Sequence, residues 1–187
     1  MQDGVYEAFA RKLADAVAAM KVGNGFEDGV TIGPLIDQAA VEKVEEHIAD
    51  AAAKGARVYL GGKRHAFGGN FFEPTVLTGV TKAMRVMSDE SFEPVAPLFR
   101  FKDEAVALAN ATEFGLASYF YTRDVGRVFR VAEALEYGIV GINEGMISTE
   151  IGPFGGIKES GLGREGSKYG IEDYIEIKYL CLGEIAQ

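Results

Sequence analysis

The 187-residue sequence has one cysteine, Cys181, no tryptophan and two histidines, His47 and His65. A single cysteine excludes an intrachain disulfide and any metal site built from several thiolates, and we expect no metal site in this chain. The two histidines are far apart, and neither lies in a cysteine, serine or carboxylate pattern typical of catalysis. We therefore favour solvated or locally hydrogen-bonded histidines over catalytic ones.

Long apolar runs and clusters of positive charge are also missing. No stretch approaches the roughly 20 apolar residues of a membrane-spanning helix, and the first residues lack the apolar region of a secretory signal. The 19 lysines and arginines are scattered through a chain of net charge −9, so the basic surface that nucleic acid requires is absent. We expect a cytoplasmic protein that binds neither nucleic acids nor membranes.

Four segments have the apolar periodicity of helices: 4–20, 37–55, 103–110 and one that ends at Gly138. In the first, apolar residues recur every four positions: Val5, Phe9, Leu13 and Val17. In the second, Asp37 can cap the start and Gly55 suits the end. The side chains expected to face inward there are Val41, Val44, Ile48 and Ala52.

Short β-rich runs alternate with these helices. They are Arg57–Leu60, Thr75–Leu77, Val95–Phe101, Ser118–Thr122 and Ile139–Asn143. Alternation of this kind indicates βαβ units. The sequence therefore predicts an α/β fold with a three-layer, open and mostly parallel sheet.

The last apolar run, Ile175–Leu182, has the pattern of a strand that is apolar on both faces near its end. Such a strand is expected to be paired rather than left with bare edges, so we predict homo-oligomerisation through it. Cys181 lies within the run, and we favour a small buried apolar residue over a reactive thiol there.

Three segments could carry chemistry. Gly161-Leu-Gly163-Arg-Glu-Gly166 has the spacing of a nucleotide-binding glycine loop, but no good strand precedes it, which favours a structural turn. Ser88–Val95 combines carboxylates with Phe92 and is either a cofactor contact or a plain acidic turn. Asn143–Gly156 begins where a strand is expected to end, the usual ligand-binding edge of an open α/β sheet.

Taken together, these stretches resemble the aldehyde dehydrogenase superfamily along essentially the whole chain, in order and spacing. The matching stretches are 22–25, 33–37, 72–76, 90–94, 114–116, 140–143, 153–156 and 160–165. Residues 119–124, 130–145 and 164–183 are most similar to the succinate-semialdehyde branch. The resemblance implies attack by a cysteine thiolate on the aldehyde, hydride transfer to NAD or NADP, and hydrolysis of the thioester.

The resemblance also implies roles for four residues. Glu90 matches the glutamate that binds the ribose hydroxyls of the cofactor, and Phe92 matches the aromatic near the nicotinamide. Phe154 matches a phenylalanine of the substrate tunnel, and Ser148 matches a serine that holds the distal carboxylate of succinate semialdehyde. The family usually has glycine where this chain has Glu93, which predicts either a benign variation or a strained, distorted pocket with a second carboxylate near Glu90.

These matches place the chain in the C-terminal part of such an enzyme. We expect a partial catalytic domain over residues 1–157 and an arm over 158–187 that ends in the oligomerisation strand. The nucleophile, the general base and the cofactor domain would be missing, so the chain alone would neither turn over nor bind a cofactor. The alternatives are a non-catalytic folding and oligomerisation module, or part of a glutarate-semialdehyde or other aldehyde dehydrogenase.

Overall fold

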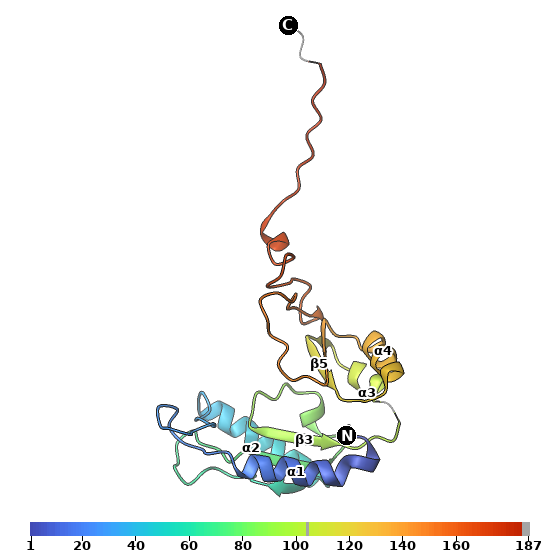
Figure 1. Cartoon of the computed structure of the whole chain (residues 1–187). Helices are drawn as coiled ribbons and strands as arrows, with labels where there is room; N and C mark the ends of the chain where they lie inside the picture. Colours follow the sequence, from blue (N-terminus) through green and yellow to red (C-terminus); the bar gives the residue numbers. More distant parts are fainter. Residues whose placement is uncertain (104, 185–187) are drawn as a thin grey trace. The chain divides into compact units, whose positions relative to one another are not determined.

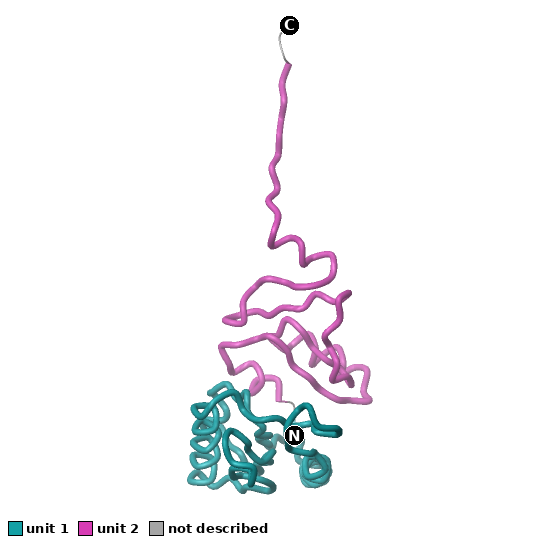
Figure 2. Tube along the Cα trace, turned by 90° about the vertical axis from the view of Figure 1, so that its left-hand side faces the viewer, with its two compact units in different colours: residues 1–104 teal, residues 105–187 magenta. Residues whose placement is uncertain are grey.

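The computed structural model describes residues 1–103 and 105–184, which belong to two compact units. Unit 1 is Met1–Glu104 and unit 2 is Ala105–Gln187; they have separate colours in Figure 2. No helix in the described ranges is long and apolar enough to cross a membrane. Each unit is described below by itself.

Unit 1 combines two long helices with one sheet (Figure 1). Its strands lie in the order β1-β2-β3; β1 is antiparallel to β2, and β3 is parallel to it. Its elements are η1 (Asp3–Val5), α1 (Tyr6–Ala18), α2 (Gln38–Ala53), β1 (Arg57–Leu60), β2 (Thr75–Val80), η2 (Arg85–Met87) and β3 (Val95–Phe99).

Helix α2 begins and ends where the sequence predicts. The Asp37 carboxylate accepts a hydrogen bond from the Ala40 amide at 2.8 Å, and Gly55 ends the helix region with a φ of 97°, an angle that glycine adopts without steric cost. The inward face of α2 differs from the predicted one at its last position. Ala51 is fully buried there, whereas Ala52 is exposed.

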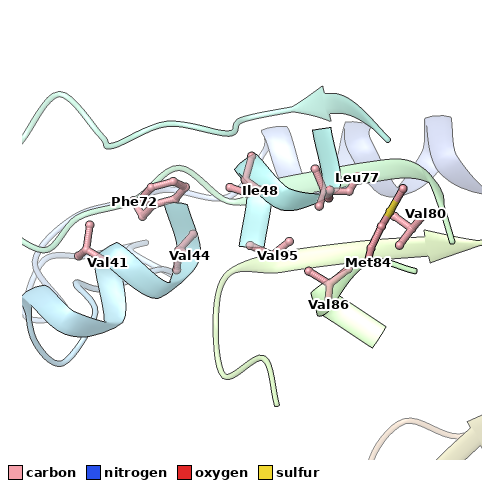
Figure 3. Packing of buried hydrophobic residues seen from close by; sticks show 10 residues of the cluster. Val41, Val44, Ile48, Phe72, Leu77, Val80, Met84, Val86 and Val95 are labelled. Carbon is pink, nitrogen blue, oxygen red and sulfur yellow. The ribbon is translucent and has the colours of Figure 1, made fainter. Parts of the chain in front are cut away.

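The two helices cover opposite faces of this sheet. Val76 and Leu77 are neighbours in β2, so their side chains point to opposite faces. Val76 belongs to the cluster that contains Tyr6 and Ala10 of α1, whereas Leu77 belongs to the larger cluster with α2. Figure 3 shows the larger cluster, which comprises Val41, Val44, Ile48, Ala51, Phe72, Leu77, Val80, Met84, Val86 and Val95.

The apolar stripe predicted for the first helix is confirmed in its second half, where Leu13 and Val17 pack against the cluster of Tyr6 and Ala10, but not in its first half. Tyr6, Ala10 and Ala14 are the buried residues of α1, whereas Val5 and Phe9 are 52% and 38% exposed. The reason is the Tyr6 hydroxyl, which donates to the Leu98 carbonyl at 2.9 Å and accepts from the Gly79 amide at 2.8 Å. This polar anchor turns the small residues of the helix toward the sheet.

Unit 2 contains two small sheets and two helices. Strands β5 and β6 pair in parallel, as the sequence pattern suggests, and β4 and β7 form an antiparallel pair of two residues each, which was not anticipated. Its elements are α3 (Val106–Asn110), β4 (Phe114–Gly115), β5 (Ala117–Phe120), α4 (Val125–Ala134), β6 (Ile139–Ile142), β7 (Ile157–Lys158) and η3 (Glu172–Tyr174).

The sheet arrangement corrects the predicted fold. The α/β class is confirmed, but the strands form three separate sheets of three, two and two strands instead of one open sheet. Among the strand pairs of the described residues, β2–β3 and β5–β6 are parallel, and β1–β2 and β4–β7 are antiparallel. Short strands explain the difference, because strands of two to six residues offer few ladder hydrogen bonds to join one sheet to the next.

The last segment also differs from its prediction. Residues 175–184 have no regular secondary structure, so the predicted strand over Ile175–Leu182 is not formed in this chain. Cys181, expected to be buried, is exposed. A strand gains its stability from a pairing partner. The division at residue 157 does not coincide with the boundary of the compact units and stays a prediction.

Candidate functional site

Glu90 and Phe92 lie in the irregular segment between η2 and β3. Both side chains are exposed, and the Phe92 ring is 87% accessible. The segment connects to the core at both ends, through the buried Val86 and Val95. The structure therefore presents a free carboxylate and a free aromatic ring on a short loop with fixed ends.

Helix α2 holds this loop through His47. The imidazole is fully buried; its Nδ1 lies 3.0 Å from Glu93 Oε2, and its Nε2 lies 3.3 Å from Asp89 Oδ2. One turn earlier, the Lys43 ammonium donates to the Glu90 carbonyl. Two side chains of one helix thus bind both ends and the middle of the loop.

Of the two alternatives expected for His47, the structure shows a hydrogen-bonded histidine and not a solvated one, with partners that are distant in the sequence. The sequence holds a signal that was missed. Position 47 lies three residues after Val44 and four before Ala51, on the apolar face of the helix. A histidine on such a face needs buried polar partners, and the two carboxylates supply them.

Glu93 does not distort the loop in the way the glycine-to-glutamate change suggested. Among the described residues, the non-glycine residues with positive φ are Asn143, Lys158 and Ser167, so Glu93 does not adopt the left-handed backbone that glycine favours. Its side chain is only 3% exposed and is directed to His47. The substitution therefore adds an internal bond, and the predicted backbone strain is absent.

Arg85 completes the charge pattern around the loop. Its guanidinium lies 3.0 Å from Asp89 Oδ2 and 3.0 Å from Glu46 Oε2, and its amide donates to Asp50 at 2.8 Å. Hydrogen bonds from Arg85 and then His47 lower the pKa of Asp89 below its ordinary value. Asp89 is therefore an ionised acceptor at neutral pH.

In unit 2, the two predicted substrate residues lie at one hollow of about 460 Å³. Ser148 and Phe154 line it together with Thr149, Glu150, Glu165 and Gly166. Phe154 is fixed by its backbone, because its amide donates to the Glu165 carbonyl at 2.9 Å and the Glu165 amide donates back at 2.7 Å. The structure thus brings together the hydroxyl and the ring that the sequence singled out.

The segment that leads into this hollow begins, as expected, where a parallel strand ends. Asn143 directly follows β6 and has a φ of 55°. Its side-chain amide accepts from the Thr122 amide and donates to the Thr122 carbonyl, both at 2.8 Å. These bonds fix the point at which the chain leaves the sheet.

Close glycine contacts hold chain segments that adjoin the hollow in the sequence. A Cβ atom on Gly138 would lie 2.0 Å from the Gly155 carbonyl oxygen, and one on Gly155 would lie 2.2 Å from that of Gly163. Arg164 Nη1 donates to the carbonyls of Gly156, Leu162 and Gly163. Residues 161–166 thus form a structural turn, as favoured by the sequence, and the next helical element is the short η3.

The four site residues fall into two pairs on separate units, Glu90 with Phe92 and Ser148 with Phe154. Within the described ranges, no group of three or more His, Cys, Asp or Glu side chains is placed to hold a metal ion. The chemistry that the arrangement offers is recognition: hydrogen-bond acceptance and ring stacking on unit 1, and hydroxyl donation beside an aromatic wall on unit 2.

Comparison with known proteins gives consistent matches. The model of the aldehyde dehydrogenase family matches residues 1–180. The chain is 70% identical to a glutarate-semialdehyde dehydrogenase of Pseudomonas aeruginosa, over 99% of the chain and 39% of that protein. It is 68% identical to an NADP(+) succinate-semialdehyde dehydrogenase of Escherichia coli, over 98% of the chain and 38% of that protein. A crystal structure of succinate-semialdehyde dehydrogenase from Burkholderia pseudomallei superposes with a TM-score of 0.95 at 67% identity. The match covers 97% of this chain and 38% of that one.

These findings correct one expectation. The sequence suggested the C-terminal portion of an enzyme, without turnover because of the parts that would then be missing. The family model matches residues 1–180, and the chain covers 38–39% of the length of its relatives. These matches support aldehyde dehydrogenase function and not that placement, which is withdrawn together with the argument built on it. With a match over nearly its full length and relatives 68–70% identical, the chain belongs to the aldehyde dehydrogenase family.

Proposed function

We propose that this chain takes part in the NAD(P)-dependent oxidation of an ω-carboxy aldehyde, succinate or glutarate semialdehyde, to the dicarboxylate. The observation that carries the proposal is the 68–70% identity to enzymes named for these two substrates over 98–99% of the chain. Because the chain spans less than two fifths of those relatives, the activity is that of the whole protein.

Glu90 and Phe92 are proposed to contact the cofactor. An exposed carboxylate accepts hydrogen bonds from ribose hydroxyls, and an exposed ring packs against a flat nicotinamide; both side chains are accessible on one loop. When bound, the cofactor accepts the hydride from the substrate. One relative is named for NADP(+), so both nicotinamides belong in the test.

Ser148 and Phe154 are proposed to select the substrate. The Ser148 hydroxyl can donate to the distal carboxylate of a semialdehyde, and the Phe154 ring offers an apolar wall for its methylene chain. Both line the same hollow. A hydrogen bond to a charged group contributes about 1.5–3 kcal/mol, which is about tenfold or more in binding.

The test is a chimera in which this chain replaces the corresponding segment of the Escherichia coli relative. We expect NADP-dependent oxidation of succinate and glutarate semialdehydes, well above that of uncharged butanal. In the chimera, Ser148→Ala should lower kcat/KM for succinate semialdehyde about tenfold or more and leave that for butanal unchanged. A chimera that folds but does not distinguish the charged from the uncharged aldehyde would refute the substrate proposal.

The isolated chain is the matched control. Its one thiol, Cys181, is exposed and has no polar partner in the part of the chain that the structure describes. A thiol without an activating base or cation is a weak nucleophile at neutral pH. We expect no NAD(P)H production by the isolated chain, and clear production would mean that Cys181 or another group acts as a nucleophile.

A second proposal is assembly. The segment Ile175–Leu182 displays exposed apolar side chains at Ile175, Ile177, Tyr179, Leu180 and Leu182. We propose that it pairs as a strand in a homo-oligomer, because pairing buries these side chains and supplies ladder hydrogen bonds. Light scattering should show an oligomer that Ile177→Asp disrupts. A strict monomer of the unmodified protein would contradict the proposal.

A further inference from the structure

His47 lies at the point where helix α2 meets the loop that carries Glu90 and Phe92. It is fully buried, and each of its two ring nitrogens faces a different carboxylate. Asp89 precedes Glu90, and Glu93 follows Phe92. The two carboxylates that contact the ring therefore bracket the two residues proposed to bind the cofactor.

The ring links both carboxyl groups to one helix. Asp89 is held ionised by the Arg85 guanidinium at 3.0 Å and accepts from the ring nitrogen that faces it. Glu93 lies 3.0 Å from the other ring nitrogen. Each nitrogen of the imidazole therefore holds one end of the loop.

The other charged groups near the ring do not replace its contacts with Asp89 and Glu93. On its own helix the nearest charged groups are Lys43, Glu46 and Asp50; Lys43 is bound to the Glu90 carbonyl, and Arg85 contacts both Glu46 and Asp50. From the loop, the charged groups that face the ring are Asp89 and Glu93. The ring therefore lies between two carboxyl groups, while Lys43 binds the Glu90 carbonyl and the Arg85 guanidinium binds Asp89 and Glu46.

Glu93 supplies a second, independent observation. Its Oε2 is bonded to His47, while its Oε1 is buried and has no hydrogen-bond partner among the described residues. A buried carboxylate with one oxygen unpaired depends strongly on its remaining partner. Loss of His47 would leave that carboxylate without a bond and favour its movement out of the interior, which displaces the loop.

We propose that His47 is a positioning residue that, bonded through both ring nitrogens, fixes residues 89–93 on α2 and so presents Glu90 and Phe92. The inference rests on the proposed cofactor role of these two residues. His47 touches neither substrate nor cofactor in this arrangement; it acts through Asp89 and Glu93.

The test is nuclear magnetic resonance of the 15N-labelled 187-residue chain, without cofactor. Because the chain has only two histidines, the ring signals can be assigned by a His65→Gln variant. The His47 ring signals should change in both Asp89→Asn and Glu93→Gln, because each ring nitrogen contacts one of these carboxyl groups. Residues 89–93 should have order parameters near the rigid value of about 0.85. A ring whose signals respond to neither change would overturn the proposal.

Variants separate the two contacts. His47→Ala should lower the order parameters of residues 90–92 below about 0.6 while those of α1 stay unchanged. Asparagine places its amide near the position of Nδ1 and glutamine near that of Nε2. His47→Asn should thus restore order at Glu93, and His47→Gln at Asp89. A loop as rigid in His47→Ala as in the unmodified chain would overturn the proposal.

Two further changes keep the test decisive if His47→Ala fails to fold. Glu93→Gln and Asp89→Asn leave the ring in place and remove one charge each. Each should mobilise its own end of the loop, and absence of an effect from both would contradict the proposal. Failure here would leave the chimera assay unaffected, since that assay measures activity and this one measures loop order.

Discussion

Units 1 and 2 differ sharply in how much apolar surface they bury. Of the sixteen buried hydrophobic residues in the described ranges, fifteen lie in unit 1, and Val131 is the exception. Of the twenty-six exposed large hydrophobic residues, seventeen lie in unit 2. Full burial of a large apolar side chain contributes about 1.5–3 kcal/mol, so unit 1 is stabilised by its own core, whereas unit 2 has no comparable core.

Unit 2 is held instead by backbone contacts. Glycines at 138, 155 and 163 allow chain segments to touch, and Arg164 and Lys158 donate to backbone carbonyls. Such contacts fix a local shape around Ser148 and Phe154 but supply little hydrophobic stabilisation. The loop that carries Glu90 and Phe92 therefore lies on the stable unit, and the hollow lined by Ser148 and Phe154 lies on the weaker one.

The largest expected effect is a core truncation in unit 1. Leu77 is fully buried, so Leu77→Ala should lower the free energy of unfolding by about 2–5 kcal/mol. Leu162 in unit 2 is 80% exposed. Leu162→Ala should therefore change the free energy of unfolding by no more than about 0.5 kcal/mol. Urea unfolding followed by circular dichroism measures both. Equal losses would contradict the contrast between the units.

A smaller effect is expected where unit 2 depends on close contact. In Gly138→Ala the new methyl would meet the Gly155 carbonyl oxygen at 2.0 Å, which costs about 1–3 kcal/mol of local stability. Hydrogen exchange of residues 136–157 should become faster. Gly145→Ala is the control, because its nearest neighbour would be the Tyr121 hydroxyl at 3.8 Å, and it should leave exchange unchanged.

The smallest effect is a dependence on pH. The pKa of Asp50 is lowered by hydrogen bonds from the Lys54 ammonium and the Arg85 amide. Its contribution to stability is therefore complete above the unfolded-state pKa of about 3.9 and is lost as the pH falls through the lower, folded-state value. Asp50→Asn should flatten the acid limb of the stability curve of unit 1.

Asp124 offers the matched comparison in unit 2. Its pKa is lowered by the hydrogen bond from the Arg127 amide. Its contribution to stability is therefore also lost as the pH falls. Asp124→Asn should leave the acid response of unit 1 unchanged, as followed by urea unfolding at pH 7, 5 and 3. An identical acid limb with and without Asp50 would show that its bonds to Lys54 and Arg85 do not contribute.

The sequence predicted the local elements better than their assembly. Asp37, Gly55 and the spacing of Val41, Val44 and Ile48 act within one helix, so α2 was found with its correct ends. The joining of strands into sheets depends on contacts distant in sequence. For this reason the single open sheet was wrong, and the two-residue pair β4–β7 was missed.

The candidate site shows the same division. Glu90, Phe92, Ser148 and Phe154 were named by resemblance, and the structure adds that each pair shares one loop or one hollow. The role of His47 was not predicted, because its partners lie 42 and 46 residues away. Periodicity places the ring on the inner face of a helix, but only the fold brings the two carboxylates to it.

The most direct test of the contrast between the units is hydrogen exchange of every backbone amide of the chain under one native condition. We predict that amides of α2, β2 and β3 exchange only through global unfolding of unit 1, whereas those of α4, β5 and β6 exchange faster through local opening. Equal protection in the two units would contradict the account, because it would mean that unit 2 has a source of stability comparable to the core of unit 1.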